Sequence, residues 1–429
     1  MRVLDFRVAN PPELPRAEVD VDSVLSVVEP VVQAIKWHGL PALQQFTQQF
    51  DKVVPEHFSV NPAELTRALE ELDPKLRQAF ETAIERRRQV AADEALEVVT
   101  TKLAPGASVT NRPVPVRRVG LYVPGGLAPL CSTVLMNVIP AQVAGVGSIA
   151  VCSPPQAEFN GLPHPSVLAM CALLGVDEVY AAGGAQAIAM LAYGIEGLCQ
   201  PVDMITGPGN VYVTAAKRLV RSKVNVDAEA GPTEIMVLAD GDANPVYVAA
   251  DLVSQAEHDP LAAAVLVSDS HQLITAVRAE LTKQVNAAKH AKRIRTALQG
   301  PQSAAILVRD LEQAVEVANE YAAEHLEIHT KNAAAVAAQI TNAGAVFVGP
   351  YAPVPLGDYT AGSTHVLPTS GFAHASSGLT VRSFTKTMQV IEYSKAAFAK
   401  VAEVVEEFGA TEDLPAHAFA ASVRKEPEK

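Results

Sequence analysis

Short apolar runs alternate with longer helical patterns through the middle of the chain. The strand-length runs of a first series lie near residues 118–123, 148–153, 177–181 and 203–206. The helical patterns that separate them lie near residues 130–145, 164–174, 184–194 and 209–222. The strand-length runs of a second series lie near residues 234–239, 263–268, 304–308 and 344–348. Repeated strands with crossover helices predict an α/β fold with two Rossmann-like parallel-sheet domains.

Both ends of the chain follow a different pattern. Apolar residues recur at helical spacing in 24–38 and 62–90, so the N-terminal segment is predicted to be mostly helical. After Pro368, a stretch rich in Gly, Ser, Thr and Ala leads into another helical pattern at 394–408. This tail has apolar positions but no predicted sheet of its own. We therefore expect it to pack on something else, and a neighbouring subunit, for which it would be a dimerisation tail, is one candidate.

Composition narrows the class of protein. The chain has 429 residues, 49% of them hydrophobic and 19% charged, so it can bury more than one core. Its formal net charge is -13 and no basic stripe is visible, so nucleic acid is not an expected partner. The four cysteines show no C-x-x-C spacing, and no leader or run of about 18 apolar residues occurs. We expect a cytoplasmic protein that does not enter the membrane.

Glycine-rich turns follow three of the predicted strands and open helices at residues 123–126, 183–186 and 207–210. Backbone N–H groups and the helix dipole at such turns favour an anion such as a pyrophosphate. None of the turns matches G-x-G-x-x-G, because Tyr212 stands at the third glycine position after Gly207 and Gly209. Taken alone, the turns fit plain connections as well as cofactor contacts.

Ligand chemistry first appears at residues 250–260, which are predicted to be the last turns of an amphipathic helix. Gln255 and His258 stand three positions apart there. Residues at this spacing share one helical face, with Cβ atoms about 5 to 6 Å apart, so both could reach one ligand or metal ion. Solvated polar residues at a helix end would be the better explanation of the pair if it stood alone.

Candidate partners of this pair follow later in the chain. They are Glu324 and His325, predicted to close another helix, Asp358 and His365 in one loop, and Glu412 and His417 near the C-terminus. Amide oxygen, imidazole and carboxylate suit a Zn²⁺-like ion. A carboxylate and an imidazole in one cleft can act as general acid and base. Adjacent helical side chains diverge by about 100°, so residues 324 and 325 would serve two proton transfers, or one ligand and one base.

Ordered motifs run along nearly the whole chain, least distinctively in its first hundred residues. They are GLYVPGG (120–126), STVLMNVIPA (132–141), GGAQAIA (183–189), GPGNVYVTAAK (207–217), AGPTE (230–234), QAEHD (255–259), EHLEIH (324–329) and GDYTAGSTHVLP (357–368). In this order they resemble the histidinol dehydrogenase family. Members are Zn²⁺-dependent homodimers that oxidise L-histidinol through L-histidinal to L-histidine with two NAD⁺, the last step of histidine biosynthesis.

The resemblance implies a role for each candidate residue. One zinc ion per subunit would be bound by Gln255, His258, Asp358 and His417, the last donated by the partner subunit of a homodimer. His325 would take the hydroxyl proton, and Glu324 would activate the water that attacks the aldehyde. Zinc would serve mainly to position the substrate imidazole and amine. The residues implied to contact NAD⁺ are Tyr122, Gln186 and Asn210, and those implied to contact substrate, besides the zinc ligands and His325, are Thr233, His365 and Glu412.

We expect four parts in this chain. They are an N-terminal extension (1–21), a discontinuous substrate and zinc domain (22–120 and 235–380), an NAD-binding Rossmann-like domain (121–234), and a C-terminal helical tail that contacts the partner subunit (381–429).

Two other classes of function fit part of the pattern. A zinc hydrolase of an amide or ester would use the same ligands, with the glutamate activating water, but it leaves the glycine turns unexplained. A catalytically silent binding protein on the same scaffold would have lost site residues, and every expected position is filled. Turnover of a scissile substrate without a cofactor would favour the hydrolase.

Overall fold

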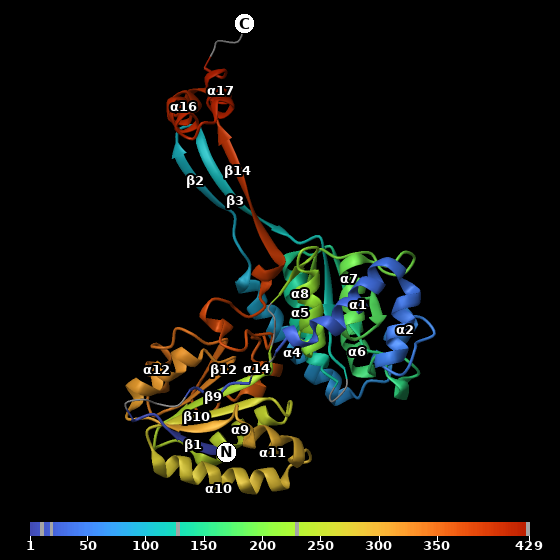
Figure 1. The fold of residues 1–429 in the computed structure, drawn as a ribbon, viewed down its shortest axis with the longest axis vertical. Coiled ribbons are helices and arrows are strands. Elements are labelled where there is room, and N and C mark those ends of the chain that lie inside the picture. Colours follow the sequence, from blue (N-terminus) through green and yellow to red (C-terminus); the bar gives the residue numbers. More distant parts are fainter. Residues whose placement is uncertain (9–12, 18–19, 126–128, 228–230, 426–429) are drawn as a thin grey trace. The chain divides into compact units, whose positions relative to one another are not determined.

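The computed structural model describes residues 1–8, 13–17, 20–125, 129–227 and 231–425. They form two compact units, one of residues 1–94 and 116–384 and the other of residues 95–115 and 385–429 (Figure 1). The first unit contains two parallel sheets, which confirms the predicted α/β class. Within the described ranges, no helix combines the length and the apolar character needed to cross a membrane.

The larger sheet has six parallel strands in the order β1-β11-β10-β9-β12-β13. Its strands are β1 (Arg2–Asp5), β9 (Glu234–Ala239), β10 (Ala263–Ser268), β11 (Ala304–Leu307), β12 (His325–His329) and β13 (Ala345–Val348). The helices packed on one face are α9 (Pro245–Ala256), α10 (His271–Ala287) and α11 (Ala291–Gln299). Those on the other face are α12 (Leu311–Tyr321) and α13 (Ala333–Ala337). Both faces are therefore buried, as parallel strands require.

The smaller sheet has five parallel strands in the order β6-β5-β4-β7-β8. Its strands are β4 (Arg118–Tyr122), β5 (Ser148–Ser153), β6 (Val179–Ala181), β7 (Met204–Thr206) and β8 (Asn225–Val226). The chain runs outward from β4 through β5 to β6, then returns to the other side of β4 with β7. This reversal places a topological switch point, where doubly wound folds bind ligands, at the carboxyl ends of β4 and β7.

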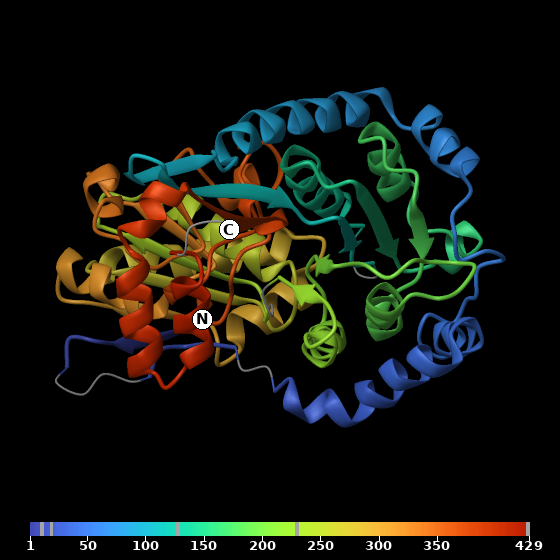
Figure 2. The ribbon, with the colours of Figure 1, turned by 90° about the horizontal axis from the view of Figure 1, so that it is seen from above.

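Helices cover both faces of the smaller sheet. The helices on one face are α3 (Pro62–Glu70), α4 (Pro74–Glu94), α5 (Cys131–Ala144) and α6 (Pro165–Leu173). Those on the other face are α1 (Asp22–His38), α2 (Leu40–Phe50), α7 (Gly184–Tyr193) and α8 (Val211–Val220). Figure 2 shows α1 and α4, in two shades of blue, on opposite sides of this sheet.

Short elements complete the first unit. They are the helix α14 (Val354–Tyr359) and the 3₁₀ turns η1 (Ala157–Phe159), η2 (Phe372–His374) and η3 (Val381–Phe384). The strand β1 lies in the segment expected to be an N-terminal extension, and it pairs in parallel with β11. The helix α1 packs against α7 and α8. Both sheets lie in one unit, so the boundaries expected at residues 120 and 234 stay a proposal.

The second unit is a three-stranded antiparallel sheet with three helices. Its elements are β2 (Val99–Ala104), β3 (Ala107–Pro115), β14 (Thr385–Tyr393), α15 (Lys395–Ala399), α16 (Ala402–Thr411) and α17 (Pro415–Ser422). The expectation that the tail has no sheet of its own is wrong, because β14 pairs along its whole length with β3. Gly409 lets α16 and α17 approach closely, since a Cβ there would lie 2.8 Å from the Ala418 backbone nitrogen.

Two predicted helix ends differ in the structure. The segment 324–329 was predicted to close a helix, and this prediction is wrong. α12 ends at Tyr321, where Ala322 takes a left-handed conformation with φ 50°, and β12 follows between β9 and β13. α9 likewise ends at Ala256 rather than near Pro260, so His258 lies in the turn after the helix. A proline disfavours helical geometry in the residue before it, which explains the early end.

Candidate active site

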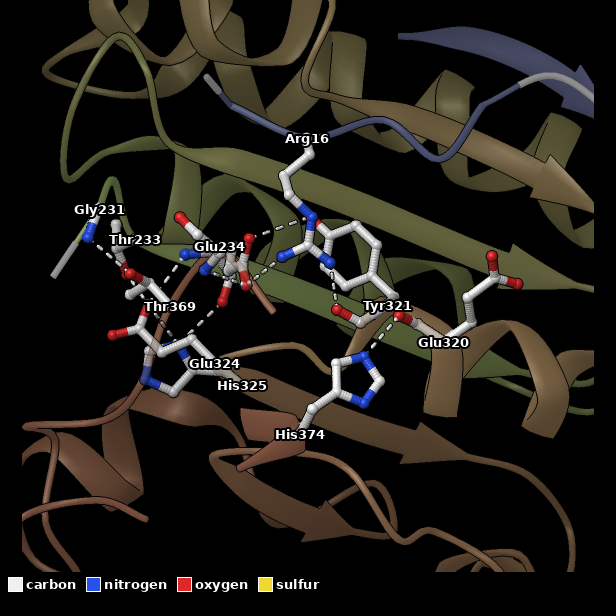
Figure 3. Close-up of polar contacts among 11 residues, drawn as sticks. Arg16, Gly231, Thr233, Glu234, Glu320, Tyr321, Glu324, His325, Thr369 and His374 are labelled. Atoms are coloured by element: carbon white, nitrogen blue, oxygen red, sulfur yellow. Dashed lines mark hydrogen bonds and ion pairs between the residues drawn. The ribbon is translucent and has the colours of Figure 1, made fainter. Parts of the chain in front are cut away.

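The pair Glu324 and His325 stands where β12 begins, beside the first residue of β9 (Figure 3). The Glu324 carboxylate accepts hydrogen bonds from Thr233 Oγ1 at 2.6 Å and from the Glu234 backbone N–H at 2.9 Å. His325 Nδ1 lies 3.1 Å from the Glu234 carbonyl oxygen. A carbonyl can only accept, so Nδ1 carries the proton and Nε2 presents a lone pair. Nε2 is buried, and no described residue bonds to it.

Burial moves these two groups toward neutrality from opposite sides. Desolvation raises the pKa of Glu324 to about 7, although the hydrogen bonds from Thr233 and Glu234 lower it. Desolvation lowers the pKa of His325, while the Asp358 charge and the bond to the Glu234 backbone raise it. At neutral pH the imidazole is therefore an uncharged proton acceptor, and the carboxyl group exchanges its proton readily.

Gln255 joins this pair from the last turn of α9. Its Nε2 donates to Thr233 Oγ1 at 2.5 Å, and that hydroxyl in turn donates to Glu324. The hydroxyl has one proton, so the amide must present its N–H₂ group to Thr233. Gln255 Oε1 is then left buried with no hydrogen-bond partner in the described part of the chain. A buried carbonyl oxygen without a partner fits a metal ligand.

Asp358 and His365 complete the same site from α14 and the segment after it. Desolvation raises the pKa of Asp358 to about 6. The His325 charge lowers this pKa, and the Glu324 charge raises it. Desolvation lowers the pKa of His365 to about 4. The hydrogen bond to the Asp358 backbone raises this pKa, whereas the charges of His325 and His258 lower it. His365 Nε2 also lies 3.2 Å from the Thr133 hydroxyl of α5. The site is thus built where helix α5 of the smaller sheet meets the larger sheet.

His258 lies exposed in the turn after α9. Desolvation and the His325 charge lower the pKa of its ring, which places the two imidazoles in one electrostatic environment. Glu412 and His417 belong to the second unit, where both are exposed at the end of α16 and on α17. The predicted residues that the first unit brings together are Thr233, Gln255, His258, Glu324, His325, Asp358 and His365.

The residues implied to contact NAD⁺ lie at the carboxyl edge of the smaller sheet. Tyr122 ends β4, and its oxygen accepts the Gly184 N–H at 3.0 Å. Gln186 lies in the first turn of α7, where Nε2 donates to Asp51 Oδ2 at 3.0 Å and Oε1 is buried without a partner among the described residues. Asn210 is exposed and caps the N-terminus of α8.

The glycine turn after β7 brings two strands unusually close. Gly207 has φ 113°, and a Cβ there would lie 2.0 Å from the Tyr122 carbonyl oxygen, so only glycine fits. Lys217 Nζ bonds both the Gly207 carbonyl and Asp227, each at 2.5 Å, and Asp227 accepts the Gly207 N–H at 2.8 Å. Sequence reasoning missed this buried ion pair. Gly126 of the first glycine turn and Ala230 of the AGPTE motif lie outside the described residues.

A second buried cluster lies further along β12, on the face that carries His325. It consists of Asp251, Glu327 and His329, whose ligand atoms all lie within 4.8 Å of one another. Burial raises the pKa of Asp251 to about 8 and that of Glu327 to about 7, and the two carboxyl groups share a hydrogen bond. Glu327 also accepts the Val354 N–H at 2.7 Å where α14 begins. The cluster therefore ties α9, β12 and α14 together, and the H-x-E-x-H alternation of a strand was the signal that could have found it.

Known proteins match this chain along nearly its whole length. The family model for histidinol dehydrogenase matches residues 14–425. A histidinol dehydrogenase of Cutibacterium acnes is 57% identical over 99% of both chains, and one of Nocardia farcinica is 59% identical over 96% of this chain and 94% of the relative. The crystal structure of histidinol dehydrogenase from Elizabethkingia anophelis matches with a TM-score of 0.92 at 33% identity, over 99% of this chain and 98% of that one. Sequence and fold together show that the chain belongs to the histidinol dehydrogenase family.

Proposed function

We propose that the protein oxidises L-histidinol through L-histidinal to L-histidine, with two NAD⁺ and one zinc ion per subunit, as the last step of histidine biosynthesis. The observation that carries this proposal is the pair of adjacent buried proton acceptors, Glu324 and His325. Oxidation of an alcohol to an acid needs one base for the hydroxyl proton and another for the water added to the aldehyde. Membership of the family supports the same substrate.

His325 is the base of the first oxidation. Its Nδ1–H is held by the Glu234 carbonyl, so Nε2 is free to accept the hydroxyl proton. Glu324 is the base of the second oxidation, in which it accepts a proton from the water that attacks the aldehyde. NAD⁺ would supply the hydride acceptor for both oxidations. Glu324 Oε2 lies 3.6 Å from His325 Nδ1, so the two side chains are neighbours and one bound carbon atom can meet both bases in turn.

The zinc ligands in this proposal are Gln255, His258, Asp358 and, from the partner subunit, His417. The unpartnered Gln255 Oε1 supports this ligand set, because its amide is already oriented by Thr233. Zinc, when bound, positions the substrate imidazole and amine beside the two bases. His365 and Glu412 are proposed to help Thr233 bind the substrate.

NAD⁺ is proposed to bind at the switch point of the smaller sheet, in contact with Tyr122, Gln186 and Asn210. The buried Gln186 Oε1 has no partner among the described residues and can accept a hydrogen bond from the cofactor. The N-terminus of α8, capped by Asn210, favours a pyrophosphate. The chain lacks a G-x-G-x-x-G motif, and the close backbone contact here is instead the one between Gly207 and the Tyr122 carbonyl.

A homodimer is also part of the proposal. In the second unit, the side chains of Ile391, Phe408 and Phe419 are 65% to 66% exposed, which leaves an apolar surface for a second copy of the chain. Glu412 and His417 are exposed on the same unit and are therefore available to a partner's site. The four free cysteines fit the cytoplasmic location that we propose.

An assay with L-histidinol tests substrate, cofactor and metal together. Purified protein should form two NADH per histidine, and a chelator should abolish this turnover until zinc is restored. NADH formation that is unaffected by metal removal would contradict the zinc site. Hydrolysis of an amide or ester without NAD⁺ would instead support the zinc hydrolase.

A further inference from the structure

We propose that Glu234 is a positioning residue for the two bases, and that Arg16 of the N-terminal segment holds it in place. This inference rests on the proposed function. The Glu234 backbone N–H bonds the Glu324 carboxylate, and its carbonyl fixes the tautomer of His325. One peptide segment thus orients both proton acceptors. A shift of this segment would misplace both of them together.

The Glu234 side chain points to the other face of the sheet. Along β9, Met236 and Leu238 share its side and pack with α12, whereas Ile235 and Val237 pack with α9 on the site's side. Only 2% of Glu234 is exposed. A carboxyl group buried this deeply costs free energy unless specific partners satisfy it. The groups that bond this carboxyl group therefore hold the start of β9 in place.

Three groups satisfy this carboxyl group. The Ser370 backbone N–H donates to Oε1 at 3.1 Å, and the Tyr321 hydroxyl donates to Oε2 at 3.3 Å. The Arg16 guanidinium lies 3.5 Å from Oε1. It also stacks 4.3 Å above the centre of the Tyr321 ring and donates to the Tyr321 carbonyl. Figure 3 shows Glu234 between Arg16 and Tyr321 on one side and Glu324 and His325 on the other.

Arg16 is the least redundant of these partners. Burial raises the pKa of Glu234 to about 7, the Arg16 charge lowers it and the Glu324 charge raises it. Arg16 is the only positive charge among these causes. The planar guanidinium bonds the carboxylate and stacks on the ring at the same time, which a lysine cannot do. The N-terminal segment thereby contributes to the site from the opposite face of the sheet.

Arg16→Ala should lower kcat by about 10- to 100-fold with little change in KM, because misplaced bases slow the chemistry rather than binding. The Arg16 side chain is 25% exposed, so the vacated space is open to solvent. Guanidinium ion at millimolar concentration should then restore part of kcat, whereas sodium at equal ionic strength should not. Arg7→Ala is the matched control, because it removes an exposed ion pair with Asp5 in the same segment. It should leave kcat unchanged.

A merely structural role predicts another result. Arg16→Ala would then lower the melting temperature and leave kcat intact, which would overturn the proposal. If Arg16→Ala does not fold, Arg16→Lys is the second variant. It keeps the positive charge but loses the planar guanidinium that stacks on Tyr321, and it should still lower kcat.

A readout without substrate separates this inference from the proposed function. In ¹⁵N-histidine spectra, with the His325 signal assigned by its loss in His325→Gln, the wild type should show His325 protonated at Nδ1. Arg16→Ala should shift the signal toward tautomer exchange. An unchanged tautomer would contradict the positioning role whatever the substrate is, whereas inactivity of the wild type on histidinol would contradict only the proposed function.

Discussion

Two neighbouring residues can act as separate bases because their surroundings treat them differently. Glu324 is held by donors, Thr233 Oγ1 and the Glu234 N–H, which favour its ionised form. His325 is held by an acceptor, the Glu234 carbonyl, which fixes its proton on Nδ1. Burial opposes charge on both. Burial therefore favours a neutral imidazole at His325 and raises the pKa of the neighbouring Glu324 carboxyl group to about 7.

Replacement of Glu324 by glutamine should separate the two half-reactions. The amide oxygen can still accept the Glu234 N–H, but the base is lost. We expect oxidation of L-histidinal to slow by about 10²- to 10⁴-fold and the first oxidation to slow much less. Single-turnover NADH formation from each substrate measures the two steps. Glu320→Gln, an exposed position four residues earlier, should change neither. Equal losses in both steps would contradict separate roles.

The pH dependence of aldehyde oxidation should follow the ionisation of Glu324. Its pKa is raised to about 7, so the carboxyl group is protonated and inactive as a base below this pH. The rate from L-histidinal should therefore rise with pH through about 7 and level off above it. The rising limb should disappear in Glu324→Gln. The same limb persisting in that variant would assign it to another group.

At the scale of elements, the contact between β4 and the turn after β7 shapes the proposed cofactor site. The Gly207 turn lies against the last residue of β4 and is held by the buried Lys217–Asp227 ion pair. No side chain fits between the two backbones. Because β4 and β7 pair in parallel up to Leu121 and Thr206, their carboxyl ends lie side by side at the switch point.

Gly207→Ala should destabilise the protein and weaken cofactor binding. The added Cβ would meet the Tyr122 carbonyl at 2.0 Å, and φ 113° is unfavourable for alanine. We expect a loss of more than about 2 kcal/mol in urea unfolding, together with a higher KM for NAD⁺. Gly147→Ala is the control, because its nearest atom is 3.6 Å away and its φ is not positive. Its stability should change by less than about 1 kcal/mol. Comparable losses in both variants would contradict the steric argument.

At the scale of the whole molecule, the second unit has too little buried surface of its own for the apolar side chains that it carries. Phe408 and Phe419 are exposed on α16 and α17 of this unit. The same unit carries His417, which we propose to be a zinc ligand in the site of the partner subunit. Assembly and activity should therefore depend on each other.

Mixed dimers should reveal whether His417 acts across the interface. His417→Ala and Gln255→Ala should each be inactive and poor in zinc. Dimers with one chain of each kind contain one intact site if His417 is donated in trans, and none if it acts within its own chain. Co-expression with two affinity tags isolates these dimers for NADH assays. Failure of the mixed dimers to turn over histidinol, with dimers confirmed by sedimentation, would rule out donation in trans.

Local patterns determined much of this protein from the sequence alone. The buried runs of β5, β9 and β10 were predicted at the residues that the structure gives them, because parallel strands with both faces covered must be continuously apolar. The ordered motifs, from the glycine turns to EHLEIH, were enough to indicate the family. The sequence pointed to the candidate residues around Glu324 and His325, but not to Glu234 or to the buried cluster of Asp251, Glu327 and His329.

Tertiary structure alone decided which of these residues meet. β12 carries His325, Glu327 and His329 on one face, so its polar residues concealed a strand that its neighbours β9 and β13 impose. The tautomer of His325 depends on a carbonyl 91 residues away. Arg16 meets a carboxyl group that lies 218 residues further along the chain. Such contacts join residues that are distant along the chain, and no local periodicity or spacing records them, because they exist only once the strands have paired.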